Sequence, residues 1–164
     1  MKLAAHGIAA DLPTGWEGTI SAERSDQVTA QAHTFDPTAR PPQTLPVAHF
    51  ATFALPAVRS DFGGAVVGDM DPDDVFVSLL EYAREEATSP LFARSGMPWR
   101  LNPRDFSPRM LQRRVRGHAG LQVFFNERGR AFCLYVVLGA TADPARLVRS
   151  VEQVLATIQI EERT

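Results

Sequence analysis

The sequence predicts an α+β fold, with an antiparallel β-sheet of about six to seven strands packed against helices, one of them a C-terminal amphipathic helix. Leu121 to Asn126 and Ala131 to Leu138 are rich in strand-forming residues, and the connection between them has the length and the glycine of a bulged hairpin turn. Asp143 then provides a helix N-cap, with Pro144 at the first helical position, where a missing N–H costs nothing. The 164 residues fit a single domain, 1–164, with a core that needs no disulfide or metal.

Shorter strands are predicted in the first half of the chain. His6-Gly7 separates two short apolar runs, as in a tight hairpin, because glycine tolerates the positive φ of such turns. The alternation of apolar and polar residues from Trp16 to Ser21 predicts a half-buried strand. Val47 to Ala54 and Val75 to Tyr82 predict two more strands. The near-continuous apolar run of the latter indicates burial on both faces of a sheet, with a buried helix as the alternative.

The segments between these strands predict loops, one helical turn and one further strand. Weak periodicity and four prolines from Ser25 to Pro46 predict a long surface loop. One helical turn is expected within Gly64 to Met70. Three prolines between Ala83 and Ser107 favour loops with at most a short helix. Met110 to Val115 predicts a strand that forms a meander with the hairpin after it.

The segment after Pro144 predicts a helix laid on the sheet. Its apolar residues recur at spacings of four, three, one and three, which places them on one stripe of a helix. They are Leu147, Val151, Val154, Leu155 and Ile158. Ile158 to Glu161 then predicts a terminal strand.

Composition and charge argue against several classes of partner. The formal net charge of -2 gives no whole-molecule attraction to nucleic acid or to an anionic membrane. No run approaches the roughly 18 to 20 apolar residues of a membrane span. His6 and Asp11 interrupt the region that would be apolar in a signal peptide. We therefore expect a cytoplasmic protein that binds neither nucleic acid nor membrane.

No motif predicts a cofactor, a metal or a catalytic residue. The acidic run from Asp69 begins like a calcium loop, but Asp74 stands where the turn needs glycine and Leu80 where a bidentate glutamate is needed. The four histidines are scattered without the spacing of a zinc site. Cys133 lies in an apolar run, which indicates a small core residue. We expect no bound cofactor, and the lack of a catalytic motif favours a non-enzymatic protein.

A cluster of arginines is the main functional lead. Seven of them lie within 23 residues and only Asp105 opposes them, so the local charge is about +6. They are Arg94, Arg100, Arg104, Arg109, Arg113, Arg114 and Arg116. Because arginine binds carboxylate and phosphate bidentately, the cluster favours docking to an acidic surface. The alternatives are pairing with acidic residues of this chain, such as Glu85, Glu86 and Asp73, and a nucleic-acid backbone, for which interleaved stacking aromatics are lacking.

The hypothesis is a non-enzymatic protein-interaction or assembly module that binds another protein or a second copy of itself. The residues assigned to its surface are Trp99, Arg100, Arg109, Arg113, Arg114 and Arg116. An exposed Trp99 beside Arg100 would be an interaction hot spot, although a tryptophan ordinarily anchors a core. The alternative is a small-ligand or enzymatic pocket between sheet and helix, in which His49 acts with Asp61 or Glu81.

The two ends of the chain also resemble a known family. The pattern from Gly7 to Trp16, with its Pro-x-Gly-Trp ending, resembles the start of PsbP-like domains, including the LpqN-type bacterial members. The strand from Ala131 to Leu138, the helix from Pro144 and the closing strand from Thr157 to Glu161 resemble their end. The resemblance implies an antiparallel sheet sandwiched by helices, and non-catalytic binding or assembly. The N-terminal cysteine of lipidated members is not matched, so we do not carry over an envelope role.

Overall fold

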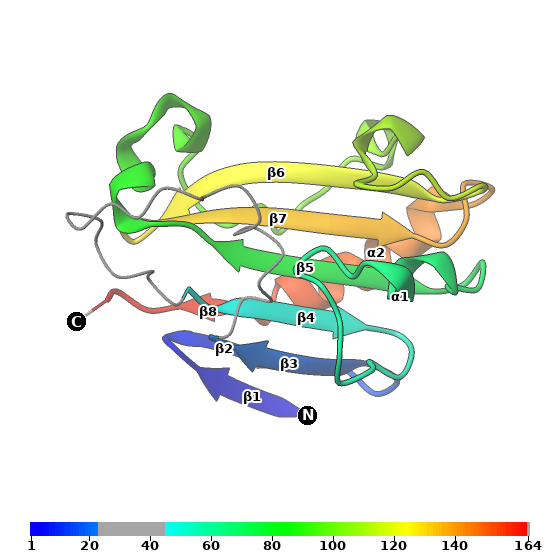
Figure 1. Cartoon of the computed structure of the whole chain (residues 1–164), viewed down its shortest axis with the longest axis horizontal. Helices are drawn as coiled ribbons and strands as arrows, with labels where there is room; N and C mark the ends of the chain where they lie inside the picture. The colour runs from blue at the N-terminus through cyan, green and yellow to red at the C-terminus, as the bar shows by residue number, and fades with distance from the viewer. Residues whose placement is uncertain (23–44, 164) are drawn as a thin grey trace, which may run out of the picture.

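The computed structural model describes residues 1–22 and 45–163, and its strands form two antiparallel sheets (Figure 1). The three-stranded sheet has the order β1 (Lys2–Ala5), β2 (Ile8–Asp11) and β8 (Gln159–Ile160). The five-stranded sheet has the order β3 (Glu17–Ser21), β4 (Val47–Ala51), β5 (Val75–Glu81), β7 (Arg130–Leu138) and β6 (Ala119–Glu127). The predicted α+β class, antiparallel pairing and C-terminal helix are confirmed. The expectation of one sheet of six or seven strands is corrected to sheets of three and five.

The centre of the five-stranded sheet is the most deeply buried part of the molecule. Every residue of β5 and of β7 is buried, and the two strands pair from Val75 opposite Leu138 to Glu81 opposite Phe132. Burial on both faces matches the near-continuous apolar run from Val75, so the strand prediction is confirmed over its buried-helix alternative.

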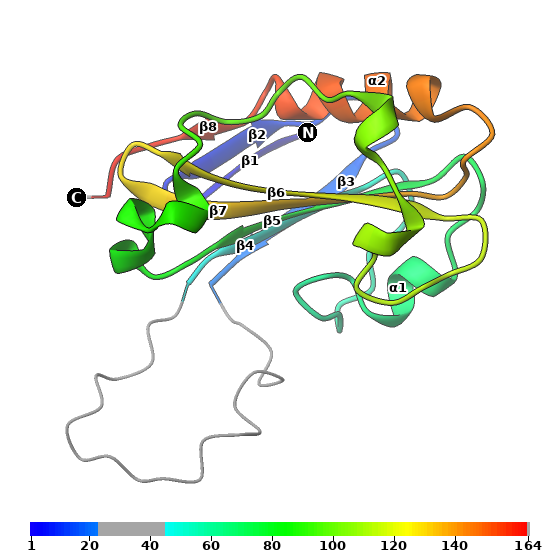
Figure 2. The same cartoon turned by 90° about the horizontal axis from the view of Figure 1, so that it is seen from above.

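Two layers cover the five-stranded sheet from opposite sides. Helix α2 (Pro144–Leu155) and the three-stranded sheet lie against one face, and the short helix α1 (Ala65–Gly68) lies on the other (Figure 2). The predicted stripe of α2 is buried against this sheet, although Ile158 lies beyond the end of the helix. Asp143 caps α2 by accepting a hydrogen bond from the Arg146 backbone N–H at 3.3 Å, as the sequence predicts.

A glycine in β3 allows the two sheets to approach each other. A Cβ at Gly18 would lie 2.6 Å from a side-chain carbon of Leu12 and 2.9 Å from one of Leu3. Leu3 lies in β1 of the three-stranded sheet, and Leu12 directly follows β2. Gly18 is also opposite Phe50 in β4, whose ring would be 2.7 Å away. Any larger residue here would therefore push the layers apart.

Both predicted hairpins are present, and both turns contain two residues. His6 and Gly7 have positive φ, and so do Arg128 and Gly129 between β6 and β7. Two central residues with positive φ are the signature of a type I′ turn, which matches the twist of the flanking strands. The bulged turn predicted after Asn126 is therefore corrected to a tight two-residue turn.

The predicted strand from Met110 to Val115 is wrong. The chain there forms the 3₁₀ helix η5 (Pro108–Met110) followed by an irregular loop. Ser107 starts η5 by accepting a hydrogen bond from the Arg109 N–H at 3.2 Å. The Gln112 N–H donates to the Tyr135 hydroxyl at 3.0 Å. Because capping and side-chain groups take up these backbone donors, the segment does not join the sheet.

The other connections follow the predictions closely. Helix α1 lies within the expected helical turn, and the region from Ala83 to Ser107 contains only short 3₁₀ helices. These are η2 (Arg84–Thr88), η3 (Pro90–Phe92) and η4 (Pro103–Asp105). The predicted loop from Ser25 to Pro46 lies outside the described residues, except for the buried Leu45 and Pro46. No helix in the described part of the chain is long and apolar enough to cross a membrane.

The arginine-bearing segment runs along the outer edge of β6. At one end of that strand, Asn126 exchanges backbone hydrogen bonds of 2.8 Å with Arg94 and Gly96. At the other end, Gly120 exchanges bonds of 2.9 and 3.0 Å with Ser107. The two attachment points are six residues apart on β6, or roughly 20 Å. The arginines are therefore spread along this edge of the sheet.

Candidate functional site

All seven arginines of the cluster are exposed, and none of them forms an ion pair with any residue that the structure describes. The expected pairing with Glu85, Glu86 and Asp73 is therefore not found in residues 1–22 and 45–163. Asp73 instead binds Arg146 at the start of α2. Within the described residues, this segment therefore presents positive charge without an acidic partner.

The arginines separate into groups along β6. Arg94 lies at the end of the strand near Asn126, while Arg100 and Arg104 flank the middle of the segment, where the Leu101 N–H donates to Glu152 of α2 at 2.8 Å. The remaining four lie beside the start of β6. The start of β6, the end of β7 and the start of α2 lie at one end of the molecule, so the chain segment that carries this last group lies near the β7–α2 loop (Figure 1).

Three of the four arginines at this end line one hollow of about 590 Å³, which we call the arginine hollow. Five of its lining residues are candidates for a functional role: Arg109, Arg114, Arg116, His118 and Thr141. Ser107 also lines it, but its hydroxyl accepts the hydrogen bond that starts η5. Arg113, the fourth arginine of the group, is not among the lining residues. Of the described residues, no aspartate or glutamate lines the hollow, so the charged residues that line it are all arginines.

Local backbone geometry places these side chains on three separate segments. Arg109 follows the Ser107 cap in η5. Arg114 and Arg116 lie in the loop that turns at Gly117, where φ is 84° and glycine avoids steric cost. The His118 N–H donates to the Val115 carbonyl at 3.2 Å and closes this turn. Thr141 completes the hollow from the loop between β7 and α2.

His118 is a lining residue of the hollow whose ring is buried in an unusual environment. The residue is only 5% exposed, and its Nδ1 has no hydrogen-bond partner among the described residues. Buried polar atoms without a partner are uncommon in folded proteins, because their lost hydration is not replaced. The candidate surface assigned from the sequence did not include His118. Neither did it include Thr141, whose contact with the hollow depends on the folding of β6 against β7.

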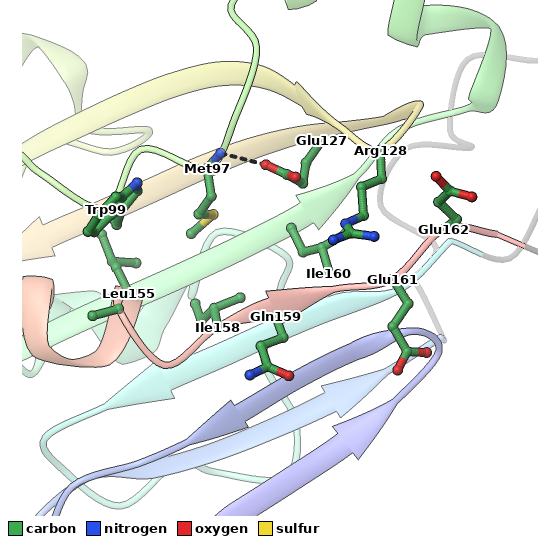
Figure 3. A pocket seen from close by; sticks show the side chains of 11 residues that line it. Met97, Trp99, Glu127, Arg128, Leu155, Ile158, Gln159, Ile160, Glu161 and Glu162 are labelled. Atoms are coloured by element: carbon green, nitrogen blue, oxygen red, sulfur yellow. Dashed lines mark hydrogen bonds between the residues drawn. The ribbon is translucent and has the colours of Figure 1, made fainter.

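Trp99 lies in a different hollow. It is 58% exposed, so the expectation of a core anchor is wrong for Trp99, whereas Trp16 is 8% exposed and belongs to the core. Trp99 lines a groove of about 510 Å³ between the end of α2, strand β8 and the β6–β7 hairpin. We call it the tryptophan groove, and its lining includes Met97, Arg128, Leu155, Ile158, Ile160 and Glu161 (Figure 3).

The six residues assigned to one surface therefore occupy different places. Arg109, Arg114 and Arg116 share the arginine hollow, and Arg113 is an exposed neighbour outside it. Trp99 lies in the tryptophan groove, with Arg100 exposed next to it in the chain. Acidic side chains from the hairpin and the C-terminal segment flank the groove, and the Met97 N–H donates to one of them, Glu127, at 2.8 Å (Figure 3).

His49 is a hydrogen-bonded core residue. Its Nε2 donates to the Asp61 backbone carbonyl at 2.8 Å, and its Nδ1 accepts from Arg59 Nε at 2.8 Å. Burial, with the Arg59 charge adding to it, lowers the pKa of His49 from 6.5 to about 4. The predicted partnership with Asp61 is thus a structural bond to the backbone. Both ring nitrogens are occupied, which leaves neither free to move a substrate proton.

Glu81, the other predicted partner of His49, belongs to a buried ion pair. Its carboxylate accepts two hydrogen bonds from Arg130, at 3.0 Å from Nε and 2.7 Å from Nη2, and both side chains are 2% exposed. Arg130 also donates to the carbonyls of His6, Gly7 and Glu161, which ties the three-stranded sheet to the five-stranded one. The sequence offers one signal for this pair: Glu81 ends one apolar strand and Arg130 begins another, and their charges are opposite.

The remaining candidates have structural roles in the described residues. Asp74 accepts hydrogen bonds from the Asp71 N–H at 2.8 Å and the Thr52 hydroxyl at 3.1 Å, and so stabilises the turn before β5. Within residues 1–22 and 45–163, no group of three or more histidine, cysteine, aspartate or glutamate side chains could hold a metal ion. Cys133 is buried in β7, and burial raises the pKa of its thiol to about 12. It is therefore a core residue, as predicted.

Comparison of the chain with protein-family models, with curated proteins and with solved structures finds no match in any of the three. The resemblance of its two ends to PsbP-like domains stays a prediction.

Proposed function

We propose that the protein is a non-enzymatic binding module that docks an acidic protein partner on the arginine-bearing edge of its five-stranded sheet. One observation carries this proposal: seven exposed arginines lie along this edge without an acidic partner among the described residues. A protein with a net charge of -2 that keeps so many unpaired cations on one segment has a strongly asymmetric charge distribution.

The chemistry of arginine favours an acidic surface as the partner. Its planar fork binds carboxylate and phosphate with two parallel hydrogen bonds, and its aliphatic stem covers apolar surface. Each exposed ion pair contributes only about 0.2 to 1 kcal/mol, so several arginines must act together. Their main effects are on the rate of association and on the choice of partner. The partner is either a different protein or the acidic face of a second copy.

The test is capture of the partner by immobilised protein at low and at high salt. We expect release at high salt, because at 1 M salt the screening length falls to about 3 Å. The variant Arg113→Glu/Arg114→Glu should lose the partner. The matched control Lys2→Glu/Arg149→Glu makes the same change in net charge at exposed positions outside the segment and should retain it. Retention by both variants would refute the proposal, and light scattering of the wild type shows whether the partner is a second copy.

The tryptophan groove favours a second candidate function, the binding of a small amphipathic ligand. Its volume of about 510 Å³ lies within the usual range of ligand sites, and Trp99 and Ile158 offer apolar contact there. Titration with the dye 1-anilinonaphthalene-8-sulfonate should change Trp99 emission in the wild type. The change should disappear in Trp99→Phe, which retains the buried Trp16 as an internal reference. An unchanged response in Trp99→Phe would exclude the groove as the binding site.

A further inference from the structure

We propose that the arginine hollow is a site for a phosphate monoester carried by a side chain of the partner protein. The proposal rests on the proposed function, because it names the group by which the acidic partner is recognised. It concerns only the end of the edge where Arg109, Arg114 and Arg116 line one concave site together with His118 and Thr141.

The number of cations favours phosphate over carboxylate. A carboxylate has two oxygens and one negative charge, so a single guanidinium fork already satisfies it. A phosphate monoester carries a charge of about −1.5 to −2 at neutral pH and three terminal oxygens, each able to accept several hydrogen bonds. Three arginines that line one hollow, with no acidic residue among the described residues of its lining, match this larger charge and acceptor number.

The uncharged residues of the hollow suit the same ligand. The Thr141 hydroxyl can donate to a phosphate oxygen, and Thr141 reaches the hollow from a different segment, the loop between β7 and α2. His118 is 5% exposed with an unpartnered Nδ1, which points to a buried polar group whose hydrogen-bonding capacity is unused in the free protein. None of the five functional side chains has another ion pair in the described part of the chain that a ligand would have to break.

The size of the hollow indicates that the phosphate arrives on a larger molecule. A volume of about 590 Å³ exceeds what a phosphate group alone occupies, so room remains for the side chain and backbone that carry it. The other arginines continue along β6 from this site, and they provide the surface against which flanking acidic residues of a protein would lie. A phosphorylated protein segment therefore fits the arrangement better than a free phosphate ester.

The experiment is a nuclear magnetic resonance titration of the full chain with three probes. The probes are a short glycine–serine peptide with one phosphoserine, the same peptide with glutamate at that position, and inorganic phosphate. We expect the phosphoserine peptide to bind about tenfold more tightly than the other two, because only it combines the dianion with a peptide carrier. Equal affinity for the glutamate peptide would overturn the assignment of phosphate. Equal affinity for inorganic phosphate would overturn the assignment to a protein-borne group.

Variants locate the binding. Arg114→Ala/Arg116→Ala should weaken the phosphoserine peptide about tenfold or more, and Arg114→Lys/Arg116→Lys should recover part of this loss because charge returns without the bidentate fork. Arg100→Ala/Arg104→Ala removes the same charge from the segment outside the hollow, and should weaken the peptide only about twofold. Equal losses in the two alanine variants would overturn the hollow as the site, while leaving the arginine-bearing edge as a docking surface.

The imidazole resonances provide a readout inside the site. The ring signals of His118 should shift when the phosphoserine peptide is added. Those of His49 should not, because both of its ring nitrogens are already hydrogen-bonded in the core. A His118 signal that stays unchanged at saturating peptide would refute the proposal, even if the peptide binds elsewhere on the arginines.

Discussion

At the residue scale, two histidines of this chain have opposite environments. His49 uses both ring nitrogens in the core, between the Asp61 carbonyl and Arg59, whereas His118 keeps an unpartnered Nδ1 beside three arginines. Both are almost fully buried. The difference shows that burial alone does not distinguish a structural histidine from a candidate binding residue, and that the hydrogen-bond partners of the ring do.

His49 predicts a component of acid sensitivity. Burial lowers its pKa from 6.5 to about 4, so the unfolded state binds the proton more readily than the folded state. The neutral ring is compatible with folding above pH 6.5, and stability is lost as the pH falls from 6.5 toward 4. The full difference corresponds to about 3 kcal/mol.

Urea unfolding at pH 7 and at pH 4.5 measures this component. His49→Gln, which keeps a donor and an acceptor but does not titrate, should lower stability at pH 7 and show a smaller loss between the two pH values than the wild type. The control His6→Asn changes an exposed histidine at a positive φ that asparagine tolerates, and should keep the wild-type pH dependence. A His49→Gln protein with the wild-type pH dependence would show that His49 is not responsible.

At the element scale, one buried side chain hydrogen-bonds to segments of both sheets. Arg130 at the start of β7 reaches Glu81 at the end of β5, the carbonyls of the β1–β2 turn and the carbonyl of Glu161 just after β8. It also lies 5.2 Å from the centroid of the Phe132 ring. A buried arginine that satisfies acceptors on three other segments fixes how those segments meet.

Removing one partner of this buried pair should be strongly destabilising. Arg130→Met removes the bidentate partner of the buried Glu81 carboxylate but leaves Arg163 Nε 3.3 Å from its Oε1. We therefore expect a loss of about 3 kcal/mol in the free energy of unfolding, the lower end for a broken buried pair. The double variant Glu81→Leu/Arg130→Met removes both charges and should be less destabilised than Arg130→Met alone. Urea denaturation of the single and double variants provides the coupling energy. Losses that simply add would mean that the pair does not act as a unit.

At the scale of the whole molecule, the two hollows lie at opposite ends of α2. The arginine hollow lies at the end of the fold where β6 and α2 begin, and the tryptophan groove lies at the other end of α2 and of β6. A net charge of -2 hides this asymmetry, because acidic residues elsewhere balance the arginines of one edge. Long-range attraction of an acidic partner depends on the local field and weakens with salt, so the whole-molecule charge is a poor guide to its binding.

Much of the fold could be predicted because its signals are local. The strands β5, β6 and β7, the turn residues Gly7 and Gly129, and the cap at Asp143 follow from apolar runs, positive φ and capping chemistry. The strand predicted from Met110 to Val115 is wrong because these residues do not pair with a neighbouring strand. One of their backbone donors, the Gln112 N–H, instead binds the Tyr135 hydroxyl. The candidate arginines and Trp99 were likewise visible from composition, but their division between two hollows was not.

The sequence by itself determined the antiparallel α+β class, the amphipathic C-terminal helix and the charge of the arginine-bearing segment, since each depends on residues close together in the chain. Only the tertiary structure decided that β8 pairs with β2, that Thr141 lies with Arg114 at one hollow, and that Arg130 reaches the β1–β2 turn. These contacts join residues far apart in sequence. Which of these contacts form depends on which buried polar groups can be hydrogen-bonded at the same time in the packed molecule. No local sequence pattern contains that information.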